Sequence, residues 1–285
     1  MLRLYVLFFC LLQVTQTYSQ TNEFEMYYPE DKLFSKLKVS AVLDTLDKPA
    51  RRHYKKEYDT LGRQISWRYV NDSVVTRFRY VHSGDTLIKQ HYYTKGKVEH
   101  ETYECEWFVY NRTGKISTYQ RSHKRETSGC NMEKFFYDDK DRPVTKLVYI
   151  NGKLVDVYSY TYVKNGNIVV KKQLAGKPEY RSIDSLYYNK ANKLVKIVSR
   201  QQQAYIGEFA VNDFHLTKTI SYETNKQTEK TYLTYALGGT DKINEDPAEV
   251  SEYIFYPDGL QQMWYHKSSG YSLSRLSYLV YEFHK

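Results

Sequence analysis

Three tryptophans are the residues of this chain best suited to binding a ligand. A large amphipathic ring can stack on the flat face of a sugar or anchor a protein interface. The three are Trp67, Trp107 and Trp264, and they do not share one position relative to the repeated pattern of the chain. We take them as candidate contacts for an acidic or neutral polysaccharide, or for a protein of the cell envelope.

Catalytic chemistry has little support in the sequence. There is no GxSxG, no HExxH and no phosphate-binding glycine loop, and the eight histidines have no recurring acid or nucleophile beside them. The acid pair Asp138-Asp139 falls in a predicted turn, where Asp is favoured for backbone reasons. We therefore predict no catalytic residue, no metal, no cofactor and no enzyme activity.

The two cysteines outside the leader, Cys105 and Cys130, leave two hypotheses open. In an oxidising compartment they can form a disulfide, since both side chains can lie on the same face of consecutive repeats. Alternatively they are separate thiols, with Cys130 in a polar loop. No pair of histidines flanks them at ligand spacing, which argues against a zinc site.

Residues 1–19 are predicted to be a secretory signal peptide. A basic residue near the start is followed by an apolar stretch, and the small residues Thr17 and Ser19 precede a cleavage site before Gln20. The apolar stretch is too short to span a bilayer. The sequence therefore predicts export to the periplasm, the cell surface or the medium.

A short pattern recurs about every 25 residues and indicates a repeat architecture. An aromatic residue is followed by three polar or turn-prone residues and then by a residue that tolerates positive φ, such as Gly, Asn or Asp. A hairpin loop of three to five residues needs such a residue to close. The predicted turn residues are Gly62, Gly84, Gly114, Asp141, Gly166, Asn192 and Gly239. Degenerate copies follow Val211, where His215 takes the turn position, and Tyr256.

Composition and alternation favour strands between these turns. The chain has 31 Tyr and 12 Phe, which suit a pleated surface. In the segment 155–163, Tyr158, Tyr160 and Tyr162 line one face. Two strands for each period imply roughly twenty strands in total. Because the turns are short, neighbours in sequence should be neighbours in the sheet.

The predicted fold is all-β: a long antiparallel meander of repeated β-hairpins that forms a twisted or coiled open sheet. Residues 51–269 hold the hairpin repeats. Residues 20–50 are expected to form an N-terminal cap and residues 270–285 a C-terminal cap strand, because an open sheet needs its edges covered. We expect one domain.

Charge gives a second clue to the partner. The chain has 42 basic and 33 acidic residues, a formal net charge of +9. Basic residues often follow the turn residue, so the repeat should gather them along one rim; these are Arg63, Lys115, Arg142 and Lys193. Such a rim can bind an acidic polymer, or it can simply keep the edges solvated and prevent aggregation. For an exported protein, polysaccharide is a better expectation than nucleic acid.

The segment Tyr58-Asp59-Thr60-Leu61-Gly62-Arg63 resembles the signature of the RHS/YD-repeat family. Tyr137-Asp138 with Arg142 is a partial match, and Tyr110-Asn111 with Gly114-Lys115 a looser one. The resemblance implies a coiling sheet of hairpins. In that family such sheets encapsulate toxin domains, act at cell surfaces and in some cases bind carbohydrate. A small exported relative fits this short chain better than a closed toxin shell. The MORN-type repeat, with its own tyrosine and glycine hairpins, is a second resemblance.

These observations favour an exported, non-catalytic β-repeat protein that binds or scaffolds at the cell surface or in the envelope. One alternative is an outer-membrane β-barrel, which shares the signal peptide, the antiparallel strands and the tyrosines. Charge on both faces of strands such as 87–95 argues against it. Another alternative, a component of a toxin or immunity system, rests on the family resemblance alone. No transmembrane helix is predicted.

Overall fold

The computed structural model describes residues 31–46, 54–69, 73–123, 130–163, 166–176, 180–206, 209–237, 240–243, 246–268 and 275–284. This part of the chain contains one short helix, α2 (Lys32–Leu37), and 19 strands. The strands are β1 (Val39–Leu46), β2 (Tyr54–Tyr58), β3 (Gln64–Tyr69), β4 (Val74–Ser83), β5 (Thr86–Lys95), β6 (Val98–Tyr110), β7 (Ile116–His123), β8 (Asn131–Tyr137), β9 (Pro143–Ile150), β10 (Lys153–Tyr162), β11 (Ile168–Leu174), β12 (Tyr180–Tyr188), β13 (Leu194–Ile206), β14 (Phe209–Tyr222), β15 (Lys226–Leu237), β16 (Thr240–Ile243), β17 (Glu249–Phe255), β18 (Gln261–Ser268) and β19 (Arg275–Phe283).

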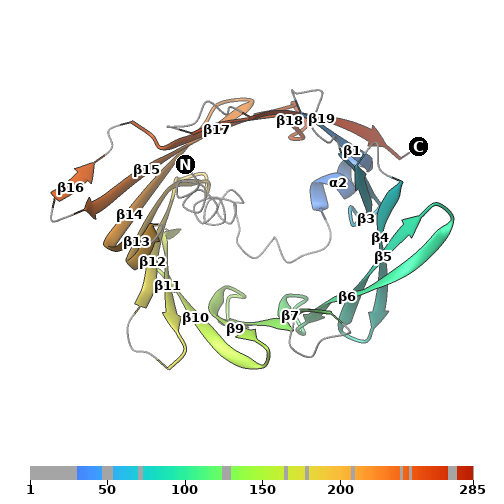
Figure 1. Ribbon diagram of the computed structural model, residues 1–285, viewed down its shortest axis with the longest axis horizontal. Helices are drawn as coiled ribbons and strands as arrows, with labels where there is room; N and C mark the ends of the chain where they lie inside the picture. The colour runs from blue at the N-terminus through green and yellow to red at the C-terminus, as the bar shows by residue number, and fades with distance from the viewer. Residues whose placement is uncertain are drawn as a thin grey trace.

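All 19 strands belong to one antiparallel meander, as the turn pattern predicted. The first half of β15 pairs with β17 and its second half with β16, so β16 and β17 share one place in the ring. The strand β1 pairs with β2 on one side and with β19 on the other. The sheet is therefore barrel-shaped (Figure 1).

The expectation of an open twisted or coiled sheet was wrong. Twist accumulates from strand to strand, and over this many strands it brings the two ends of the sheet together. They then pair through registers such as Val42 with Tyr281, which removes two open edges. The segments that were expected to cap an open sheet supply β1 and β19, which join each other.

Apart from the copy at Gly239, which lies outside the described residues, the repeated turns lie at one end of the barrel, because each period contains two strands. We call this end the repeat rim and define it by the loops 59–63, 84–85, 111–115, 138–142, 163–167, 189–193, 223–225 and 256–260. The copy predicted after Val211 does not exist, since His215 lies inside β14. The chain turns instead after Tyr222, where Glu223 N–H donates to the carbonyl of Lys226.

One face of the sheet points into the barrel and carries most of the buried side chains. The helix α2 lies inside the ring beside β1 (Figure 1), and Phe34 of this helix packs edge-to-face on Tyr58 with ring centroids 4.7 Å apart. Following the strand registers from Tyr58 around the ring identifies the remaining inward positions, which include Leu87, Phe108 and Glu106. We call this face the inner wall.

The apolar core is a band on the inner wall close to the repeat rim. One cluster contains Leu87, Phe108, Ile116 and Phe135, with tyrosines packed around it. A second contains Leu194, Ile197 and Ile220. In the third, Val39, Val42 and Leu260 pack against Leu33, Phe34 and Leu37 of α2.

The helix α2 is fixed to the first repeat turn by its ends as well as by its apolar side. Asp31 caps its first turn by accepting from Phe34 N–H at 2.9 Å. The Asp31 N–H donates to the carbonyl of Gly62 at 3.1 Å, and Ser35 Oγ donates to that of Thr60 at 3.0 Å. The helix therefore sits on the loop 59–63.

Candidate ligand-binding site

The structure places the predicted turn residues on the repeat rim. Six have positive φ: Gly62 (75°), Gly84 (60°), Gly114 (77°), Asp141 (57°), Gly166 (77°) and Asn192 (57°). Gly239 lies outside the described residues. In the copy after Tyr256, Gly259 has positive φ, whereas Leu260 is buried in the core. These residues shape turns and line no pocket as a group.

In four of the turns, the residue after the repeat tyrosine closes the loop from within. The Oδ1 atom of Asp59 accepts hydrogen bonds from the N–H groups of Leu61 and Arg63. Asn111, Asp138 and Asn189 make the same two bonds in their own turns. The Asp or Asn at this position therefore stabilises the backbone of the turn.

The basic residue of the repeat joins one repeat to the next. Arg63 Nε donates to Asp59 Oδ2 at 2.7 Å, and the guanidinium lies 4.6 Å from the ring centre of Tyr80 in the following repeat. Arg142 repeats this arrangement with Asp138 and with Tyr162, at 4.2 Å. The basic residues do gather on one rim, yet these two are already engaged within the protein.

The repeat tyrosines have a structural role as well. Their hydroxyls reach the repeat next to them and donate to a backbone carbonyl near the start of a strand. The bonds are Tyr80 to Gln64 (2.8 Å), Tyr137 to Ile116 (2.7 Å), Tyr162 to Pro143 (3.0 Å), Tyr222 to Leu194 (2.9 Å) and Tyr281 to Gln261 (2.6 Å). These rings are not free to bind a ligand at their polar end.

Deeper in the barrel the inner wall is polar. We call this layer the charge belt; its residues are Asp44, Lys56, Lys89, Glu106, Glu133, Lys146, Asp156, Lys172, Asp184, Lys218, Glu229 and Glu249. Several form ion pairs across neighbouring strands, as Lys218 does with Glu229 at 3.0 Å, both side chains being only 4% exposed. Lys172 and Asp156 pair at 3.0 Å. Buried charges need such partners.

Glu106 of the belt has three side-chain partners. Its carboxylate contacts Lys89 Nζ at 2.9 Å and His91 Nε2 at 2.7 Å, and it accepts from the Tyr119 hydroxyl at 3.0 Å. Burial by itself would raise the pKa of Glu106, but the hydrogen bond with His91 and the Lys89 charge outweigh it and bring the pKa to about 2. Lys89, His91 and Tyr119 are thus all engaged with the Glu106 carboxylate.

The three tryptophans do not form one site. Trp67 on β3 faces inward and packs edge-to-face on Tyr69, with centroids 5.5 Å apart. Trp264 on β18 also faces inward and is stacked on His266 at 5.8 Å. Trp107 lies on the outer face of β6, because its neighbours Glu106 and Phe108 face inward.

The predicted disulfide between Cys105 and Cys130 is absent. Cys105 lies on β6 and Cys130 directly precedes β8, with β7 between them. Strands two places apart are separated by about 10 Å, whereas the Cα atoms of a disulfide lie within about 7 Å of each other. The Cys130 sulfur accepts from Gln120 Nε2 at 3.1 Å instead. The two thiols are therefore separate.

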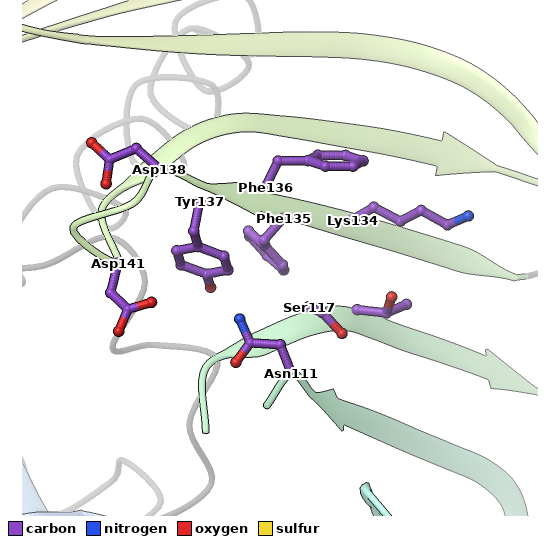
Figure 2. Close-up of a pocket in the computed structure, with 9 residues that line it drawn as sticks. Asn111, Ser117, Lys134, Phe135, Phe136, Tyr137, Asp138 and Asp141 are labelled. Carbon is purple, nitrogen blue, oxygen red and sulfur yellow. The ribbon is translucent and has the colours of Figure 1, made fainter. Parts of the chain in front are cut away.

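The larger of two hollows lies where β7 and β8 diverge toward the repeat rim (Figure 2). Its volume is about 560 Å³, and Asn111, Lys134, Phe136, Asp138 and Asp141 are among the residues that line it. Asn111 and Asp138 cap their own turns, and Asp141 accepts from the Thr113 hydroxyl at 3.0 Å. Its turn side chains are thus engaged in holding two turns together.

The smaller hollow, of about 270 Å³, lies under α2 on the inner wall, and we call it the α2 cavity. Asp44, Tyr54 and Lys56 line it from β1 and β2, and Trp264, Ser277 and Tyr281 from β18 and β19. Burial, together with the neighbouring Asp44 carboxylate, raises the pKa of Tyr54. Of the three predicted ligand residues, only Trp264 lines either hollow. The sequence held no signal for Asp44 and Lys56, which come from the segments expected to cap the sheet and to begin the repeats.

Two further features bear on the kind of site. Within the described residues no group of three or more His, Cys, Asp or Glu side chains could hold a metal ion. The described residues contain no helix that is long and apolar enough to cross a membrane.

The fold and the site together define a barrel-shaped antiparallel sheet with a polar, charge-paired inner wall. No protein-family model matches the chain, and no curated protein matches it. Among solved structures, it is similar to a porin-like protein from Bacteroides uniformis, with 9% identity, a TM-score of 0.39, and coverage of 86% of this chain and 97% of the other. A porin-like protein from Bacteroides vulgatus gives 11% identity, a TM-score of 0.31, and coverage of 86% and 98%.

Proposed function

We propose that the mature chain is an exported, non-catalytic β-barrel protein that binds saccharide chains in the envelope or at the cell surface, with its inner wall as the binding surface. The observation that carries this proposal is the polar inner wall, where charged side chains lie over aromatic rings, as Lys146 and Lys172 do over Tyr158. A sheet of this many strands encloses more space than its own side chains fill. The signal peptide predicted from residues 1–19 supports export.

The outer face favours water as its surroundings. Arg79 and Glu99 form an ion pair there at 2.6 Å, and Lys55 pairs with Glu282 at 2.8 Å. A third outer pair joins Lys226 to Glu252 at 2.7 Å. These pairs lie in different sectors of the ring, and a lipid-facing band tolerates few charges near its middle.

An outer-membrane β-barrel is the second candidate, and the closed ring favours it. Closure between the first and last strands removes the sheet edges, which is a requirement for strands that cross a bilayer. A polar inner wall is also shared with membrane barrels. The outer ion pairs are the reason for placing this candidate second.

One experiment tests both candidates. The full-length chain would be expressed in a bacterial host that processes signal peptides, and its envelope separated into soluble and membrane fractions. We expect the mature protein in the soluble fraction, and it should then bind neutral or acidic polysaccharides saturably when followed by tryptophan fluorescence at low and high salt. Recovery only with detergent would favour the membrane barrel. Soluble protein that binds no glycan would contradict the proposed ligand.

A further inference from the structure

The α2 cavity contains polar groups whose needs the protein does not meet. Asp44 is 9% exposed, and its Oδ1 atom is buried with no hydrogen-bond partner among the described residues. A buried carboxylate oxygen without a donor is costly. Burial lowers the pKa of Lys56 in the same cavity, although the charge of Asp44 acts in the opposite direction. A ligand that donates a hydrogen bond would satisfy the Oδ1 atom of Asp44.

The walls of the cavity are aromatic. Tyr54 and Tyr58 come from β2 and Trp264 from β18, so rings stand on both sides of the junction between β1 and β19. Phe34 of α2 adds a further ring to the lining of the cavity. Ring faces of this kind pack on the apolar C–H side of a flat polar molecule.

We propose that the α2 cavity binds one neutral sugar ring, either a free monosaccharide or the end of a saccharide chain; this rests on the proposed function. Sugar hydroxyls donate to Asp44 and accept from Lys56, while the ring's C–H face packs on Trp264. An anionic group is disfavoured by Asp44 and a cationic group by Lys56. The volume of about 270 Å³ matches a single ring better than an extended chain.

The test uses the mature protein, residues 20–285, titrated calorimetrically with glucose, galactose, mannose and N-acetylglucosamine, and with glycine as a zwitterion. We expect one or more of the sugars to bind with a stoichiometry of one. Asp44→Asn and Trp264→Leu should each weaken binding by about tenfold or more. Trp107→Leu, on the outer face, is the matched control and should leave the affinity unchanged. Thermal unfolding of each variant checks that it is folded, and Ser277→Val is a second variant should Asp44→Asn fail to fold.

The outcomes separate this inference from the proposed function. Glycan binding that Asp44→Asn, Ser277→Val and Trp264→Leu leave unchanged would overturn the α2 cavity as the site while the proposed function stands. Binding of glycine and of no sugar would overturn the assigned ligand class. Absence of any saccharide binding, whether of monosaccharides or of polymers, would overturn both.

Discussion

The hydroxyl of Tyr137 at the end of β8 donates a 2.7 Å hydrogen bond to the carbonyl oxygen of Ile116 at the start of β7. The backbone ladder between these strands runs only from the pair Thr118–Lys134 to the pair Arg121–Asn131. The tyrosine bond therefore joins the strands where the ladder has ended, beside the larger hollow. Other repeats use the same tyrosine contact, which makes it a recurring joint of the repeat rim.

Removing this hydroxyl should destabilise the barrel. We expect Tyr137→Phe to lower the free energy of unfolding by about 1 kcal/mol, the usual net value of one such bond. Tyr187→Phe is the matched control, because Tyr187 lies on the outer face and is 39% exposed. Urea unfolding of the mature protein measures both. Equal losses in the two variants would show that the joint adds no stability.

A pair of glycine substitutions tests whether α2 is seated on the first repeat turn. Gly62 and Gly114 have nearly the same φ, 75° and 77°, so an alanine at either costs a similar backbone strain of roughly 1–2 kcal/mol. A Cβ at Gly62 would also clash with the Asp31 carbonyl oxygen, whereas at Gly114 it meets open space. We expect Gly62→Ala to cost roughly 1–3 kcal/mol more than Gly114→Ala.

Urea titration of the two glycine variants and the wild type provides the comparison. Similar losses for Gly62→Ala and Gly114→Ala would mean that α2 does not rest on the loop 59–63 in solution. The same variants report on the α2 cavity, because α2 forms one of its walls.

The sequence predicted the hairpins because turn chemistry is local. A residue such as Asn192 or Asp141 has to adopt positive φ at a fixed distance from an aromatic, and this pattern is readable in a few letters. The prediction failed at His215, where the pattern occurs inside the long strand β14. The turn after Tyr222 was missed because it closes within three residues, two fewer than the full pattern.

Closure and the α2 cavity had no comparable local signal. The pairing of Val42 with Tyr281 depends on twist summed over the whole ring and not on any short motif. The sequence also did not reveal which side chains point into the barrel. Register shifts at several hairpins change which residues point inward, as between Val109 and Tyr110. Only the full set of registers separates Trp107 from Trp67 and Trp264.

Acid should weaken the barrel through Glu106. The pKa of the Glu106 carboxyl falls from its ordinary value of 4.5 to about 2 in the folded protein. Its contribution to stability is therefore fully present above about pH 4.5 and is lost as the pH falls toward 2. The shift corresponds to on the order of 3 kcal/mol. We expect the free energy of unfolding of the wild type to fall over this range and that of Glu106→Gln to fall less. Parallel pH profiles of the two proteins would contradict this.

The cysteines give a test that needs no variant. We expect mature protein denatured without reductant to take up two equivalents of iodoacetamide, one each at Cys105 and Cys130, and prior reduction should not change this mass. In the native protein Cys130 should react faster, because Cys105 is only 2% exposed. If the alkylated mass rises only after reduction, Cys105 and Cys130 form a disulfide. The strand β7 would then have to move out from between β6 and β8.

Closure between β1 and β19 also determines when, during folding, the edges of the sheet are protected from pairing with other molecules. The strands that complete the ring come from opposite ends of the sequence, and contacts of such long range form slowly. Until β19 is in place, β1 and β18 are bare edges able to pair with another molecule. A fragment that lacks β19 should therefore aggregate, however well its own hairpins form. Secretion of this protein would then require a chain kept unfolded until its final strand has crossed the membrane.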